Sequence, residues 1–164
     1  MSASGDPQHG FRDTIGHFAT GVTIVTAAGP DGPAGMTTNA VTSLSLDPML
    51  LLVCFEQASR TLPVVRDAGR FAVNVLRAGD EDLAALFATK AVARAKFESV
   101  AHGEEHGVPV LDRALAWIAC DLRSLQEAGD HVIAIGEVLG TGVDGDDDPL
   151  VWFRGRYMTV VRRV

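Results

Sequence analysis

Apolar and β-branched residues recur along the chain in short runs that turn-forming residues separate. Runs of this length and composition predict β-strands, because branched and aromatic side chains suit a pleated, half-buried surface. The run at 49–55, "MLLLVCF", has no polar position and predicts a strand buried on both faces. The predicted strands are residues 22–28, 49–55, 70–76, 115–128, 131–142 and 149–161.

Three segments have helical spacing instead. Phe11, Ile15 and Phe18 lie at helical intervals and predict a helix that stops at Gly21. Residues 59–69 predict a short helix, with Ser59 or Thr61 as its cap, a proline in its first turn and a glycine at its end. Residues 80–97 begin with acidic residues and carry lysine and arginine later, as the helix dipole favours.

The order of these elements predicts the fold class. Strands follow one another at hairpin distances, for example around "GPDGP" at 29–33, without regular alternation with helices. This order favours a mainly β fold, an antiparallel barrel with peripheral helices, over a doubly wound sheet. We expect residues 1–9 to be a mobile tail and residues 10–164 to form one domain. Residues 102–114 and 144–148 are predicted loops.

Composition narrows the functional classes. The formal net charge of −7 over 164 residues argues against a general nucleic-acid binder, which needs a basic surface. The sequence shows neither a signal peptide nor an apolar run of membrane-spanning length, so no membrane association is expected. Cys54 and Cys120 are far apart and lie in apolar segments, which favours core thiols in a reducing cytoplasm over a disulfide.

Two motifs with metal-binding patterns are rejected. "HGEEH" at 102–106 matches a zinc peptidase pattern, which needs both histidines on one helix face. The glycines in and after it argue against a helix and favour an exposed loop. "DGDDD" at 144–148 lacks the glycine and glutamate that a calcium loop needs at its sixth and twelfth positions. No metal site is therefore expected.

Two polar segments are candidates for ligand binding. "TTNAVTSLS" at 37–45 is rich in hydroxyl and amide side chains that suit a planar heterocycle, although a strand with one exposed face has a similar composition. "SRT" at 59–61 opens a predicted helix, where backbone N–H groups and a guanidinium suit a phosphate. An ordinary helix cap with a surface arginine fits the same residues.

The segment "GDHVIAIGEV" at 129–138 has a polar entrance. His131 fits an acid–base group, a metal ligand, a donor to a ligand or a structural residue, and the residues alone leave these alternatives open. Asp130 is not expected to pair with it, because neighbours along a strand point to opposite faces. Glu137 has no predicted role beyond a polar position at the end of the strand.

Five motifs together resemble the flavin reductase family. They are "FATGVTIVTA", "GMTTNAVTSLSLDP", "RFAVNVL", "GDHVIAIGEV" and "PLVWFRGRY", in the family's order over about residues 11–161. The resemblance implies an FMN-binding split barrel and a homodimer with flavin in a groove near the interface. Ala40 and Val41 stand where family members often have serine and phenylalanine, which leaves side-chain contacts there in question.

The resemblance also implies site residues. It assigns flavin contacts to Thr37, Thr38, Asn39 and Ala40, the isoalloxazine edge to Ser43, Leu44 and Ser45, and positions beside the cofactor to Cys54 and Phe55. Ser59, Arg60 and Thr61 are implied to hold the phosphate. Phe87 and Phe97 are implied to lie near the flavin, and His131, with Tyr157, on the nicotinamide side.

The activity that the resemblance implies is hydride transfer from NADH or NADPH to FMN, with FAD as the alternative flavin. The reduced flavin would supply a separate monooxygenase. No protein nucleophile is needed, because the cofactors carry the chemistry. A second interpretation of the sequence is a flavin-binding electron-transfer or sensor protein on the same barrel. A third is a β-barrel module that binds another ligand.

Overall fold

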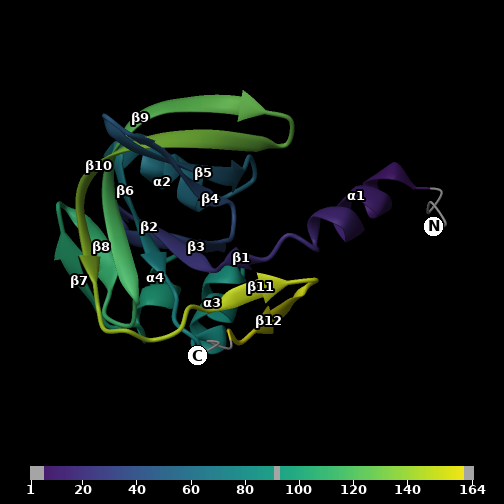
Figure 1. The fold of residues 1–164 in the computed structure, drawn as a ribbon. Helices are drawn as coiled ribbons and strands as arrows, with labels where there is room; N and C mark the ends of the chain where they lie inside the picture. Colours follow the sequence, from purple (N-terminus) through teal and green to yellow (C-terminus); the bar gives the residue numbers. More distant parts are fainter. Residues whose placement is uncertain (1–5, 91–92, 161–164) are drawn as a thin grey trace.

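The computed structural model describes residues 6–90 and 93–160, and its largest element is a seven-stranded antiparallel sheet (Figure 1). The strand order is β3-β2-β6-β9-β10-β5-β4. The strands are β2 (Thr23–Gly29), β3 (Gly32–Thr38), β4 (Val41–Leu46), β5 (Met49–Glu56), β6 (Arg70–Val75), β9 (Ala116–Ala128) and β10 (His131–Val143). The prediction of a mainly β fold with antiparallel strands is confirmed.

Hairpins join three of the six neighbouring strand pairs of this sheet, β2–β3, β4–β5 and β9–β10. Gly29 pairs with Gly32 in the β2–β3 hairpin, so the prediction of a hairpin around residues 29–33 is confirmed. The longest hairpin joins β9 and β10 at Gly129, whose φ of 65° suits a glycine. In Figure 1, β9 and β10 bend over β4, β5 and α2, so the sheet is strongly curved.

The main core lies inside this curve. It combines apolar residues from β2, β5, β6, β9 and β10 with Leu62 and Val65 of α2 (Thr61–Ala68). Exposure alternates along β5: Leu51, Val53 and Phe55 are buried, and the residues between them are partly exposed. The prediction that β5 is buried on both faces was therefore wrong, because only one face of the strand meets the core.

A buried polar network fastens the sheet to a small hairpin. Asn74 on β6 donates to the carbonyl of Ile24 at 3.0 Å and accepts from the amide of Leu111 at 2.9 Å. Leu111 ends β8 (Val108–Leu111), which pairs with β7 (His102–Glu105). Residues predicted as a loop thus form a hairpin, because valines at 108 and 110 bury their side chains beneath it. "HGEEH" lies in this hairpin and not on a helix.

A three-stranded sheet of order β1-β11-β12 lies beside the main sheet. Its strands are β1 (Thr20–Gly21), β11 (Val151–Phe153) and β12 (Arg156–Met158). The segment 149–161 was predicted as one strand, but Arg154 and Gly155 turn it back on itself, both with positive φ. Val161 lies outside the described residues.

The helices differ from their predicted bounds. α1 is Pro7–Ile15, so it starts inside the predicted tail and ends before Phe18, and Phe11, Ile15 and Phe18 are all exposed. The predicted helix over 80–97 is two helices, α3 (Glu81–Ala88) and α4 (Ala93–Phe97), although residues 91 and 92 lie outside the described part. None of the helices within the described ranges is long and apolar enough to span a membrane.

Candidate functional site

A cavity of about 530 Å³ opens where β3, β5, α2, α3 and α4 converge near the start of β10. We call it the main cavity. Its size falls in the range of small-molecule sites. The predicted site residues that line it are Thr37, Thr38, Asn39, Ala40, Cys54, Ser59, Arg60, Thr61, Phe87 and His131.

One end of the main cavity is the start of α2. The hydroxyl of Ser59 accepts from the backbone N–H of Thr61 at 3.2 Å, so Ser59 satisfies one of the free donors at the start of the helix. The guanidinium of Arg60 donates to the carbonyl of Lys90 at 2.7 Å. The remaining donors of this end, with the charge of Arg60, suit a phosphate group.

Lys96 is a cavity residue that the sequence analysis missed. Only 5% of it is exposed, and its ammonium donates to the carbonyls of Phe87 at 3.0 Å and Gly35 at 3.4 Å. Burial, and then the nearby charge of Arg60, lower the pKa of Lys96. No carboxylate of the described chain forms an ion pair with Lys96, although Glu56 also lines the main cavity. The apolar residues next to Lys96 in the sequence do not by themselves predict that the lysine side chain is buried.

Residues 37–40 form a polar wall of the main cavity at the corner between β3 and β4. Thr38 accepts the backbone N–H of Ala40 at 3.1 Å through its hydroxyl, and the amide of Asn39 donates to Thr20 at 3.1 Å. The carbonyl of Ala40 accepts from the backbone of Cys54. These bonds hold the corner in place without large side chains, which leaves room for a planar ligand. Burial raises the pKa of the Cys54 thiol, so it stays protonated at neutral pH.

His131 begins β10, and it pairs across the sheet with Glu56 of β5. Its Nδ1 lies 2.7 Å from a carboxylate oxygen of Asp130. The expectation that Asp130 would not be its partner was wrong, because Asp130 lies in the turn before the strand, where side chains do not alternate. The hydrogen bond with His131 lowers the pKa of the Asp130 carboxyl. His131, which lines the main cavity, is thus hydrogen-bonded to the exposed carboxylate of Asp130.

The other predicted residues lie outside the walls of the main cavity. Ser43, Leu44 and Ser45 are on β4, and Leu44 is 47% exposed. Phe55 is fully buried in the main core. Phe97 is also buried and packs edge-on against Phe87, which does line the cavity, at a centroid distance of 5.0 Å. Phe97 therefore packs against a residue of the cavity wall, and Phe55 belongs to the main core.

Tyr157 belongs to a neighbouring cavity of about 250 Å³, which we call the side cavity. The two cavities share Thr37, Thr38, Asn39 and Ala88 in their walls. The ring of Tyr157 packs against Trp152 at a centroid distance of 5.0 Å. The structure thus brings Tyr157 to the same polar corner as the main cavity.

In the described ranges, no group of three or more His, Cys, Asp or Glu side chains is placed to hold a metal ion. Both cysteines are free thiols, and burial raises the pKa of Cys120 to about 12. Glu137, which had no predicted role, forms an ion pair with Arg123 on the neighbouring strand β9.

The fold and the main cavity together define a class, a mainly β protein with a cavity lined by basic side chains and small polar residues. Comparison with known proteins makes this class specific. The chain belongs to the flavin reductase like domain family, whose pattern it matches over residues 15–160.

Curated relatives match most of the chain. It is 40% identical over 154 residues to a flavin reductase of Pseudomonas putida, which covers 93% of this chain and 89% of that protein. It is 43% identical over 148 residues to the reductase component of a 4-nitrophenol 4-monooxygenase/4-nitrocatechol 2-monooxygenase from Rhodococcus opacus, with 90% and 78% covered. Among solved structures, it resembles the NADH:FAD oxidoreductase SgcE6 of Streptomyces globisporus C-1027 in complex with NAD and FAD fragments. That match has a TM-score of 0.89 and 34% identity, with 98% and 97% covered.

Proposed function

We propose that this chain is an NAD(P)H-dependent flavin reductase that supplies reduced flavin to a separate monooxygenase. The observation that carries the proposal is the main cavity, which combines a cationic phosphate end with a polar, small-residue wall and a histidine at its mouth. Relatives named as flavin reductases and as monooxygenase reductase components support it.

The residues of the main cavity fit a flavin. Lys96 is a buried cation without a carboxylate partner in the described chain, and a phosphate would compensate its charge. Arg60 and the start of α2 would hold the same group. The corner at 37–40 would lie along the isoalloxazine ring, with Phe87 beside it. When bound, the flavin accepts a hydride from the nicotinamide and so supplies the redox chemistry.

The protein's own contribution is positioning. His131 lies at the mouth of the main cavity, where Asp130 fixes its imidazole, so we infer that it places the nicotinamide over the ring. Tyr157 would close the other side through the side cavity. Two molecules that react in solution lose translational and rotational entropy when they meet, and this loss is a large part of the reaction barrier. A protein that holds the flavin and nicotinamide rings in contact removes this loss from the hydride-transfer step. FMN is the preferred flavin, with FAD as the alternative, and both NADH and NADPH are candidate donors.

Exposed apolar surface supports a homodimer. Phe11, Ile15 and Phe18 are between 51% and 70% exposed on and after α1, which extends away from the rest of the chain (Figure 1). Leu46 and Met49, at the β4–β5 turn, are also exposed. Apolar patches of this kind mark interaction surfaces. We propose a homodimer, in which Ser43, Leu44 and Ser45 would meet the flavin at the interface of a single-domain split barrel spanning residues 10–164.

The activity test is NADH oxidation by the purified chain with free flavin added. We expect steady oxidation, followed at 340 nm, in the presence of FMN or FAD, with transfer to oxygen or to a monooxygenase component. A protein that binds flavin but does not turn over NADH or NADPH would be an electron-transfer or sensor protein instead. Running both flavins with both nicotinamides also identifies the preferred pair.

Replacing His131 with alanine should raise KM for NADH or slow flavin reduction about tenfold, while the Kd for flavin changes little. The reason is that an orienting contact to the nicotinamide contributes to one substrate only. Stopped-flow reduction and a flavin titration measure the two quantities. Asp130→Asn is the matched variant, since it keeps the shape of the partner and removes its charge. Unchanged kinetics in both variants would remove His131 from the nicotinamide site.

A further inference from the structure

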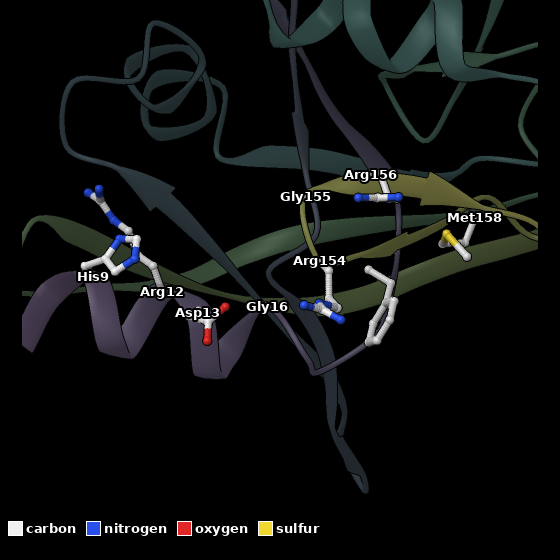
Figure 2. Close-up of a pocket in the computed structure, with 9 residues that line it drawn as sticks. His9, Arg12, Asp13, Gly16, Arg154, Gly155, Arg156 and Met158 are labelled. Carbon is white, nitrogen blue, oxygen red and sulfur yellow. The ribbon is translucent and has the colours of Figure 1, made fainter. Parts of the chain in front are cut away.

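A second cleft lies between α1 and the β11–β12 hairpin, separate from the main cavity. It has a volume of about 510 Å³. Figure 2 shows His9, Arg12 and Asp13 of α1 on one wall and Arg154 and Arg156 of the hairpin on the other. We call it the arginine cleft. A backbone hydrogen bond of 2.8 Å from Arg154 to Gly16 joins the two walls, so they form one unit.

The arginines of this cleft differ from most others in the described chain. Arg70, Arg77, Arg113 and Arg123 each pair with one or two carboxylates. Arg12, Arg154 and Arg156 form no ion pair and no side-chain hydrogen bond with any residue of the described ranges. The only carboxylate in the walls of the cleft is that of Asp13. In a chain of net charge −7, three unpaired guanidiniums around one cleft favour an anionic ligand.

The hairpin connects this cleft with the proposed active site. Trp152 and Tyr157 are cross-strand partners that face the side cavity. Phe153 and Arg156 are the next pair, and they line the arginine cleft. Alternation along a strand therefore puts the two sites on opposite faces of one two-stranded ribbon.

We propose that the arginine cleft binds the phosphates of the adenine-nucleotide end of a dinucleotide, either FAD or the nicotinamide co-substrate. The inference rests on the proposed function. Guanidiniums on two facing walls suit a pyrophosphate, which offers oxygens on both sides. Phe153 and Met158 add an apolar edge against which a purine ring can pack. A concave site with charge on both walls fits a small anion better than the flat surface of a partner protein.

The direct test uses ADP as the probe, because ADP carries the pyrophosphate and the adenine without either redox ring. We expect ADP to bind the wild-type chain in calorimetry and to bind the Arg12→Gln/Arg156→Gln double variant at least tenfold more weakly. Arg66→Gln is the matched control, because Arg66 is an exposed arginine of α2 that also has no ion pair in the described part of the chain. Its ADP affinity should equal that of the wild type.

Comparing FAD with FMN, and NADH with reduced nicotinamide mononucleotide, shows which dinucleotide the arginine cleft binds. A loss of FAD affinity with unchanged FMN affinity assigns the cleft to FAD. A rise in KM for NADH, with unchanged KM for reduced nicotinamide mononucleotide, assigns it to the co-substrate. If ADP does not bind the wild type, or if FMN and FAD lose affinity equally in the double variant, the proposal is overturned. ADP binding needs no turnover, so the result is independent of the proposed activity.

Discussion

Replacing Arg60 with alanine is expected to weaken FMN binding about ten- to a hundredfold while riboflavin binding changes little. The guanidinium lies at the cationic end of the main cavity, beside the start of α2 and the buried ammonium of Lys96. A hydrogen bond to a charged group contributes roughly 1.5–3 kcal/mol, which corresponds to that range of affinity. Riboflavin lacks the phosphate and should not detect the loss. Fluorescence quenching of the two flavins measures both constants.

Two variants control this experiment. Arg66→Ala removes an arginine from the same helix at an exposed position, and it should leave both affinities unchanged. Lys96→Met keeps a long side chain and removes the second cation, so it should also weaken FMN more than riboflavin. If Arg60→Ala weakens both flavins equally, the lost bond to the carbonyl of Lys90 has altered the cavity, and Arg60 is not a phosphate ligand.

Replacing Gly136 with alanine is expected to lower the free energy of unfolding by about 1–3 kcal/mol, the usual range for overpacking a core. A Cβ at this position of β10 would lie 2.6 Å from the ring of Phe71 and 2.8 Å from the Cβ of Cys120. Both neighbours are fully buried, so neither has space to move. Urea denaturation of the flavin-free protein measures the change.

Gly103→Ala is the matched control for this prediction. Gly103 is also a strand glycine, but a Cβ there meets no atom within 4 Å. Its stability should stay within about 0.5 kcal/mol of wild type. A Gly136→Ala variant as stable as Gly103→Ala would show that the core around Phe71 can shift, contrary to the packing described here.

These residues also show what a sequence pattern can and cannot predict. The longer apolar strands and the hairpin at 29–33 followed from local composition, because turn residues and branched side chains act over a few positions. Glu137 had no explanation in the sequence, since its partner Arg123 is brought to it only by strand pairing, and the close contact between Gly136 and Phe71 arises in the same way. The prediction that Asp130 would not pair with His131 was wrong for a different reason, which concerns neighbouring residues. Strand alternation was applied to Asp130, which lies one residue outside the strand.

The candidate site also contains some residues that the sequence could predict and one that it could not. Residues 37–40 and 59–61 could be predicted, because their small polar side chains stand out between apolar runs. Lys96 could not, since nothing near it in sequence marks a lysine as buried, and its position depends on how α4 packs against β3 and α3. The β7–β8 hairpin was missed because its four-residue strands lie among glycines and charges that are typical of loops.

The location of the cations in the main cavity has a consequence for how the product leaves. Arg60 and Lys96 would contact the phosphate, whose charge is the same before and after the ring is reduced. Their attraction therefore strengthens the binding of oxidised and reduced flavin equally, and it cannot favour release of one over the other. In the proposed site, any preference would arise at the ring, from the corner at 37–40 and from His131. For a reductase that passes its product to another enzyme, contacts at the phosphate would slow the dissociation of both forms of the flavin alike, and contacts at the ring would determine which form dissociates faster.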